Sequence, residues 1–139
     1  LGGEGLRAVS ENAILNANYM RSQLKDVLHM PVDAPALHEV VFNDRNQRDL
    51  NLDTTKIAKR LIDYGMHPMT VHFPLCVKNA IMIEPTETES RSEMDRFVSA
   101  VKEILKSPNQ ENAPVRVFRE KVDETKAARE LRLTYLFKE

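Results

Sequence analysis

Proline is the residue type that most limits how this chain can fold, because most of its seven prolines stand where a helix or strand pattern stops. Proline has no backbone N–H to give to a helix or a sheet, and its ring restricts the residue before it. These prolines follow the first helical pattern, two short apolar runs and the last strong helical pattern: Pro31, Pro35, Pro74, Pro85 and Pro108. The chain is therefore expected to fold into short elements separated by turns.

The amino-terminal part predicts one long helix and one short strand. Apolar residues at heptad spacing, Leu6, Ala13 and Met20, give an apolar stripe to a helix from about Gly5 to Leu28. The run from Leu37 to Phe42 is short, is rich in valine and phenylalanine, and is followed by the turn residues Asn43, Asp44 and Asn46. This composition predicts a strand.

Two further helices are predicted from the residues that begin and end them. Asp53 can cap one helix, and Gly65 suits the left-handed position after its end. Ser90 and Glu93 form a capping box for the other helix, which Pro108 closes. Between these ends the apolar residues recur at helical spacing: Ile57, Leu61 and Ile62 in the first, and Met94, Phe97, Val98, Val101, Ile104 and Leu105 in the second.

Two more strands are expected between these helices, at Thr70 to Phe73 and at Ile81 to Ile83. The order helix, strand, helix, two strands, helix spaces the strands unevenly. This favours an α+β fold, with a small sheet and helices packed on one face, over a doubly wound sheet. At 139 residues, a single domain is the default expectation.

The tail after the third helix gives a weaker pattern. The polar stretch from Ser107 to Ala113 is expected to be a loop, and the short segment from Val115 to Phe118 follows it. Asp123 to Leu131 has helical composition, whereas Arg132 to Phe137 alternates like a strand, so both kinds of element are expected there.

The composition excludes several classes of protein. Apolar residues make up 42% of the chain and charged residues 29%, which is typical of a globular protein. The 20 basic and 21 acidic side chains are interspersed and supply no positive field for nucleic acid. No apolar run approaches the roughly 20 residues of a membrane span. The single cysteine, Cys76, cannot form an internal disulfide, so a reduced, cytoplasmic location is expected.

No complete catalytic or metal site can be read from the residue types alone. His67 and His72 are an odd number of positions apart, so they would face opposite sides of one strand, and no metal site is expected. Cys76 has apolar neighbours and is interpreted as a small half-buried residue rather than a reactive thiol. The segment Gly2–Gly5 is interpreted as a turn before a helix, with phosphate contact as the alternative.

Two polar runs allow both a structural and a functional interpretation. The acidic run that includes Glu84 and Glu87 precedes a helix, where its dipole favours carboxylates. Alternatively, Glu84, Thr86 and Glu87 belong to a loop at the end of a strand, with their polar groups pointing into a cleft. His67 and Thr70 allow the same two interpretations, as turn residues or as polar groups at the mouth of a strand.

These runs resemble a known family. KRLIDYGMHPMTVHFPL and MIEPTETES are similar to the small-domain signature of the P-protein family, the decarboxylating glycine dehydrogenases, and GGEGLRAVSENAILNANYM resembles the helix that leads into that domain. The stretch FPLCVKNAIMIEPTE resembles the two-subunit bacterial form more than the single-chain form. The resemblance runs from Leu1 to about Leu105, and the segment from Pro114 through Ala128 is similar to the family's tail. The final residues, RELRLTYLFKE, depart from the proline-containing basic tail of the family.

The resemblance implies the C-terminal small domain of a fold-type-I, aspartate-aminotransferase-like enzyme. The segments would be a leading helix (1–30), an α+β core (31–106), and a loop and tail (107–139). The family's pyridoxal phosphate is held by a lysine of the large domain, which would precede Leu1. Lysines of this chain such as Lys56, Lys59 and Lys102 fall on polar helix faces, so the chain alone is expected neither to bind the cofactor nor to be active.

For the parent enzyme, the resemblance implies that glycine is decarboxylated with pyridoxal phosphate as the electron sink. The aminomethyl group would pass to the lipoyl arm of the H-protein, and subunit 1 of the P-protein would be a second partner. Within this chain, His67 and Thr70 would donate hydrogen bonds on the substrate side of a cleft, and Glu84 and Glu87 would order the loop that also contains Thr86.

Two alternatives stay open at this point. Another fold-type-I aminotransferase or decarboxylase would be expected to bind a substrate carboxylate with an arginine, and the motif region from Tyr64 to Glu89 contains none. A free-standing α+β regulatory or interaction module would need no missing partner, whereas a domain cut from a larger enzyme should expose a sizeable apolar patch.

Overall fold

A computed structural model describes residues 1–108, 114, 116–117 and 122–131. The elements are, in chain order, helix α1 (Gly2–Leu24), strand β1 (Val40–Asn43), the 3-10 helix η1 (Arg45–Leu50), helix α2 (Thr54–Asp63), strand β2 (Thr70–Val71), strand β3 (Ala80–Ile83), helix α3 (Arg91–Lys106) and helix α4 (Glu124–Arg129). The strand expected at 132–137 lies outside the described residues, as do most of the loop expected at 107–113 and the ends of the run 115–118.

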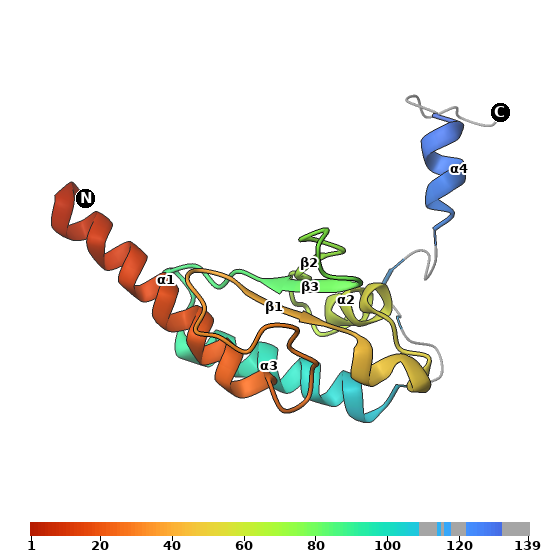
Figure 1. The fold of residues 1–139 in the computed structure, drawn as a ribbon, viewed down its shortest axis with the longest axis horizontal. Coiled ribbons are helices and arrows are strands. Elements are labelled where there is room, and N and C mark those ends of the chain that lie inside the picture. The colour runs from red at the N-terminus through yellow and green to blue at the C-terminus, as the bar shows by residue number, and fades with distance from the viewer. Residues whose placement is uncertain (109–113, 115, 118–121, 132–139) are drawn as a thin grey trace.

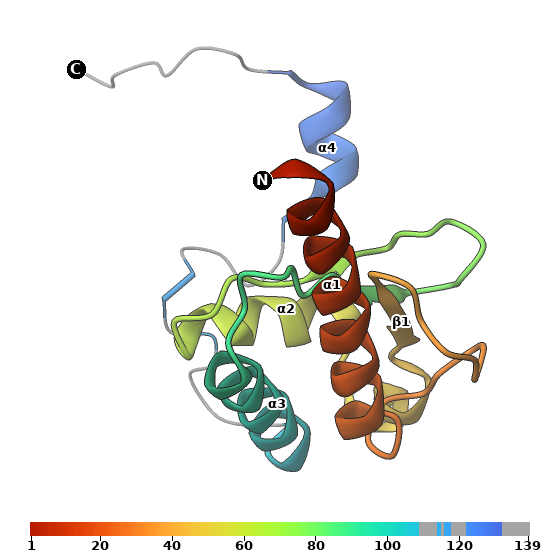
Figure 2. The same cartoon turned by 90° about the vertical axis from the view of Figure 1, so that its left-hand side faces the viewer.

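The three strands form one antiparallel sheet in the order β1-β3-β2, which confirms the α+β class. Phe42 pairs with Ile81, and Ile81 also pairs with Val71, so these side chains share one face of the sheet. Helices α1 and α3 run together beneath the sheet, and the end-on view shows α2 beside them (Figures 1 and 2). All four residues of the central strand β3 are buried.

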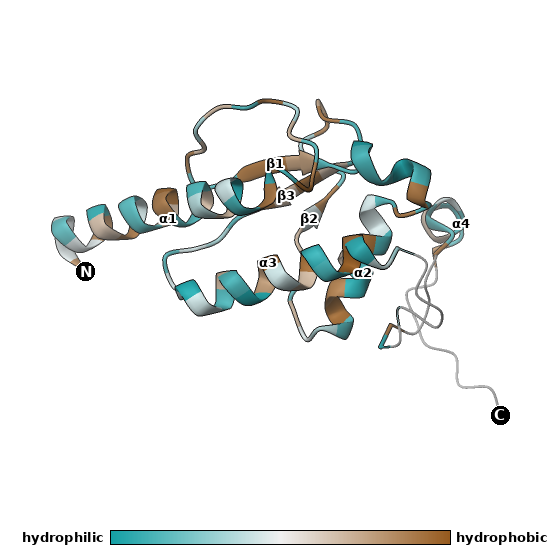
Figure 3. Cartoon of the chain, turned by 90° about the horizontal axis from the view of Figure 1, so that it is seen from below, coloured by the Kyte–Doolittle hydropathy of each residue, from teal (hydrophilic) through white to brown (hydrophobic). Residues whose placement is uncertain are grey.

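The core forms where the helices meet the sheet. Its strands are predominantly apolar, whereas α1 and α3 alternate between polar and apolar residues, as amphipathic helices do (Figure 3). The buried apolar cluster draws residues from every layer: Met20, Leu24, Leu28, Val40, Phe42, Leu52, Ile57, Leu61, Ile81, Ile83, Met94, Val98, Ala100, Val101 and Ile104. No helix among the described residues has the length and apolar character needed to cross a membrane.

The predicted helix ends are confirmed for α2 and α3. The Asp53 carboxylate accepts a hydrogen bond from the Lys56 backbone N–H at 2.8 Å, and Ser90 Oγ accepts one from the Glu93 N–H at 3.2 Å. Gly65 has a φ of 70°, the left-handed conformation expected after α2. These caps satisfy backbone N–H groups that the first turn of each helix leaves unpaired.

The bounds of other elements differ from the prediction, and strand β3 does so by one residue, since it starts at Ala80 instead of Ile81. Helix α1 runs from Gly2 to Leu24 instead of from Gly5 to Leu28. Residues 25–27 form a tighter turn, in which the Val27 N–H donates to the Leu24 carbonyl three residues back at 3.0 Å. Strand β1 starts three residues later than expected, at Val40.

The strand expected at 70–73 is also shorter than predicted. Strand β2 stops at Val71, since the next residue, His72, has a φ of 58° and leaves the extended conformation.

A buried carboxylate joins the segments after β1, and the sequence interpretation had treated it as an ordinary turn residue. Asp44 is 1% exposed. Its oxygens accept hydrogen bonds from Asn79 Nδ2 at 3.0 and 3.2 Å, from the Thr54 N–H at 3.4 Å and from Arg48 Nε at 3.2 Å. Asp44 therefore fixes η1, the start of α2 and the loop before β3 to one another.

Candidate functional site

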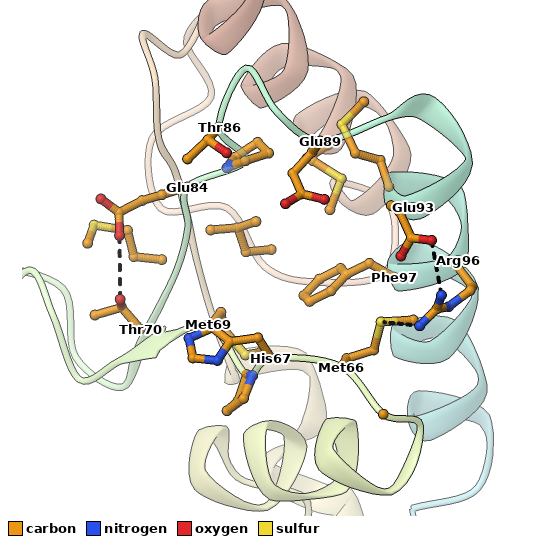
Figure 4. A pocket seen from close by; sticks show the side chains of 17 residues that line it. Met66, His67, Met69, Thr70, Glu84, Thr86, Glu89, Glu93, Arg96 and Phe97 are labelled. Carbon is orange, nitrogen blue, oxygen red and sulfur yellow. Dashed lines mark hydrogen bonds and ion pairs between the residues drawn. The ribbon is translucent and has the colours of Figure 1, made fainter.

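A cleft of about 530 Å³ opens at the end of the sheet. Its walls are the segment 65–70 after α2, the end of β3 with the residues that follow it (82–86), and the exposed side of α3 (Figure 4). Met20 of α1 also lines it. The cleft forms because β2 is only two residues long, so the last part of β3 has no neighbouring strand on that side.

Four of the five predicted cleft residues line this cavity. His67 and Thr70 lie on one wall, and Glu84 and Thr86 lie on the wall formed by the end of β3 (Figure 4). Thr70 Oγ1 donates a long hydrogen bond to Glu84 Oε2 at 3.5 Å, so the two walls are in polar contact. Glu87 is exposed and does not line the cavity.

A turn explains why a different carboxylate takes the place expected for Glu87. The Glu89 N–H donates to the Thr86 carbonyl at 3.2 Å, which reverses the chain before α3. Glu89, two residues further along, therefore lines the cleft beside Thr86 (Figure 4).

Acidic side chains dominate the charge of the cleft. Glu84, Glu89 and Glu93 line it. Among the described residues, no lysine lines the cleft, and the one arginine that does is Arg96. Arg96 comes from α3, outside the region 64–89 that contains no arginine. It is held by Glu93 Oε1 at 3.0 Å, and its other nitrogen lies 3.7 Å from Met66 Sδ. The carboxylates of the cleft therefore attract positively charged groups such as an ammonium, and Arg96 is the lining side chain that could attract an anion.

The apolar part of the cleft is built from methionine. Of the six methionines in the chain, the cleft takes all except Met30: Met20, Met66, Met69, Met82 and Met94 line it. Methionine is unbranched and flexible, so a surface made from it can adapt to the shape of what it contacts. Phe97 supplies a more rigid apolar wall.

The other groups considered as sites from the sequence lie apart from the cleft. His72 does not join His67; its Nε2 lies 3.1 Å from Thr55 Oγ1. Cys76 is an exposed free cysteine, not the half-buried residue expected from its apolar neighbours, because it lies in the loop between β2 and β3.

One group of possible metal ligands occurs in the described part of the chain. Ligand atoms of His38, Glu39 and Glu84 lie within 4.8 Å of one another. His38 and Glu84 are exposed, and exposed carboxylates often gather in this way without a metal ion.

Asn16 contributes to the cleft and was missed by the sequence interpretation. It is only 8% exposed, on the side of α1 that carries Ala17 and Met20 into the core. Its Nδ2 donates to the Thr86 carbonyl at 2.9 Å and, more weakly, to the Glu89 carbonyl at 3.4 Å. A polar residue within an apolar stripe was the signal that could have identified it.

Comparison with known proteins gives one consistent family. A family model described as "Glycine dehydrogenase, C-terminal domain" matches residues 9–125. The chain is 46% identical over 140 residues to "Probable glycine dehydrogenase (decarboxylating) subunit 2" of Bacillus velezensis, an alignment that covers 97% of this chain and 28% of the relative. Proteins with the same name from Alkaliphilus oremlandii and Listeria innocua are 46% and 44% identical, over 93% and 97% of this chain and 28% and 29% of the relatives. The chain thus spans less than a third of the length of these relatives.

Proposed function

Because the chain belongs to the family of glycine dehydrogenase C-terminal domains, we propose that it forms the carboxyl-terminal small domain of a fold-type-I enzyme that decarboxylates glycine. Its segments would be a leading helix (1–30), an α+β core (31–106), and a loop and tail (107–139). The observation that carries the proposal is the cleft in which His67, Thr70, Glu84 and Thr86 lie together. In this proposal the cleft faces the substrate.

The cleft does not fit pyridoxal phosphate as an anchor site. The cofactor's aldehyde requires a lysine amine, and no lysine among the described residues lines the cleft. The lining is also rich in carboxylates, which would repel the phosphate group. The cofactor, which supplies an electron sink when bound, would therefore be held by another part of the longer protein, and this chain alone would be inactive.

The polar residues of the cleft are suited to bind and orient a small substrate. His67 and Thr70 are exposed on the same wall, and the described residues give His67 no hydrogen-bond partner. The bond from Thr70 to Glu84 is long, so the hydroxyl can turn to another acceptor at little cost. When the domain closes, the methionines and Phe97 would exclude water around these groups.

The remaining steps of the proposal concern partners. The aminomethyl group left after loss of carbon dioxide would pass to the lipoyl arm of the H-protein, and subunit 1 of the P-protein would complete the enzyme. The unpaired Cys76 is compatible with a cytoplasmic enzyme. The family match favours this function over another aminotransferase or decarboxylase and over a free-standing module. The exposed Leu6 and Leu15 on α1 agree with a domain that packs against further protein.

The test uses the complete enzyme, reconstituted from the full-length subunit, its partner subunit and pyridoxal phosphate. His67→Ala and Thr70→Val should each lower kcat/KM for glycine by about tenfold or more, because each removes a hydrogen-bond donor from the cleft. His72→Ala and Thr55→Val are matched controls, since these two residues bond to each other outside the cleft. Normal rates for both cleft variants would show that this cleft does not serve the reaction.

A further inference from the structure

We propose that Asn16 is a positioning residue, whose side-chain amide holds the loop formed by residues 86–89 in the conformation that the cleft requires. The inference rests on the proposed function, because it assigns to Asn16 a role in the same cleft. Asn16 does not itself line the cavity. It acts through Thr86 and Glu89, which do.

The hydrogen bonds of Asn16 join segments that are far apart in the sequence. Its Nδ2 reaches the carbonyls of Thr86 (2.9 Å) and Glu89 (3.4 Å), which are 70 and 73 residues away in sequence. The Thr86 carbonyl also accepts the Glu89 N–H at 3.2 Å. One amide group thus contacts both ends of the turn, and it does so from a side chain that is more than nine-tenths buried.

The loop receives little other support from outside. Thr86 Oγ1 is paired with Thr88 Oγ1 at 2.7 Å, which is a contact within the loop itself. Among the described residues, Asn16 is the one side chain beyond the loop that bonds to the backbone of residues 86–89. Loss of that amide would leave two carbonyls without their side-chain donor, and residues at the cleft wall would no longer be fixed.

Asn18 provides a matched comparison on the same helix. Its Nδ2 donates to the Ala36 carbonyl at 2.7 Å, and its Oδ1 accepts from the Ala36 N–H at 3.0 Å. These bonds fix the connection between α1 and β1, which does not line the cleft. Asn16 and Asn18 therefore perform the same physical task on two different loops, and only one of those loops belongs to the cleft.

The informative substitution is Asn16→Asp. Aspartate has the size of asparagine, so it creates no cavity, but an ionised carboxylate has no donor to offer to the Thr86 and Glu89 carbonyls. Asn18→Asp removes the donor to Ala36 in the same way. Asn16→Ser and Asn18→Ser form a second matched pair, for use if a buried carboxylate prevents Asn16→Asp from folding.

The experiment measures kcat and KM for glycine in the reconstituted full-length enzyme, together with Tm. Asn16→Asp should lower kcat/KM by about tenfold, whereas Asn18→Asp should lose a similar amount of Tm and keep wild-type kinetics. A purely structural role for Asn16 would move Tm in both variants and leave both sets of kinetic constants unchanged. That result, or equal kinetic losses in the two variants, would overturn the proposal.

Hydrogen exchange of the enzyme separates this inference from the proposed function. Asn16→Asp should raise exchange about tenfold at the amides of residues 86–90 and leave that of Ala36 unchanged. If exchange rises and Thr70→Val lowers the rate, but Asn16→Asp keeps normal kinetics, the positioning role is wrong and the function stands. If Thr70→Val and His67→Ala have normal rates, the assignment of the cleft fails, and the role of Asn16 falls with it. Unchanged exchange in Asn16→Asp would refute the contact itself.

Discussion

Replacing Asp44 with alanine should be among the most damaging single changes to this domain. The carboxylate is 1% exposed and accepts hydrogen bonds from Asn79, Thr54 and Arg48. Removing it leaves the Thr54 N–H, on a residue that is 0% exposed, without this acceptor. It also leaves the half-buried side-chain amide of Asn79 without its acceptor.

The expected loss of stability can be estimated from these groups. Each donor left unsatisfied in a buried place costs about 1–3 kcal/mol, and the Arg48 contact adds little because that side chain is 46% exposed. The Thr54 bond is long and counts at the low end of this range. The free energy of unfolding should therefore fall by about 3 kcal/mol in Asp44→Ala.

Urea unfolding of the 139-residue chain, followed by circular dichroism, measures this change. With a slope of about 2 kcal/mol per molar urea, the midpoint should fall by about 1.5 M while the slope stays constant. Asp49→Ala is the matched control, because Asp49 is an exposed aspartate of the 3-10 helix that directly follows Asp44, and it should change stability by less than about 0.5 kcal/mol. Equal midpoints for the two variants would refute the reasoning.

Two further predictions concern the contact of α1 with α3 and the cleft. The hydrogen bond from the Tyr19 hydroxyl to Asp95 raises the pKa of Tyr19, so Asp95→Asn should lower it in an ultraviolet titration, with Tyr64, whose pKa is raised mainly by burial, as the unchanged reference. Because the pKa of Tyr19 is raised in the folded state, the stability that this bond contributes is present below about pH 10 and is lost as the pH rises through that pKa. If Asp95→Asn left the pKa of Tyr19 unchanged, the assignment of the bond would be contradicted. In methionine-methyl NMR of the reconstituted enzyme, addition of glycine should shift the five methionines of the cleft and leave Met30 in place; a shift confined to Met30 would contradict the proposal that the cleft faces the substrate.

The elements that could be predicted from the sequence are those specified by neighbours along the chain. Asp53 and Ser90 cap helices through N–H groups only three residues away, so a short motif contains the whole interaction. Gly65 marks the end of α2 for the same local reason. The order of helices and strands followed from such signals, and the α+β class followed from the order.

The parts that could not be predicted depend on residues that meet only after folding. Asp44 resembles a turn residue until Asn79 and Thr54 reach it, and Asn16 resembles one more polar residue of a helix until the segment 86–89 packs against it. The early end of β2 depends on the left-handed conformation of His72, and no local sequence motif predicts that conformation.

The sequence also singled out residues of the candidate cleft, and their role in the cleft stays a prediction. The runs around His67 and Glu84 are distinctive in sequence, and the structure brings them to opposite walls of one cleft. Glu87, one of the predicted cleft residues, does not line the cavity, whereas Glu89 does, because the turn between Thr86 and Glu89 reverses the chain there. Arg96 entered the cleft from a helix outside the motif, which a search of contiguous sequence does not reach.

Helix α1 has a mechanical consequence for the domain as a whole. Its buried residues all lie in its second half, while its first turns project away from the sheet (Figure 1). With 23 residues, the helix is about 34 Å long, so a tilt of about 10° moves one end by about 6 Å relative to the other. A hydrogen-bonded helix transmits such a tilt as a stiff lever. A protein that binds the projecting turns would therefore rotate the sheet, the methionine-lined cleft and the loop held by Asn16 together, as one body.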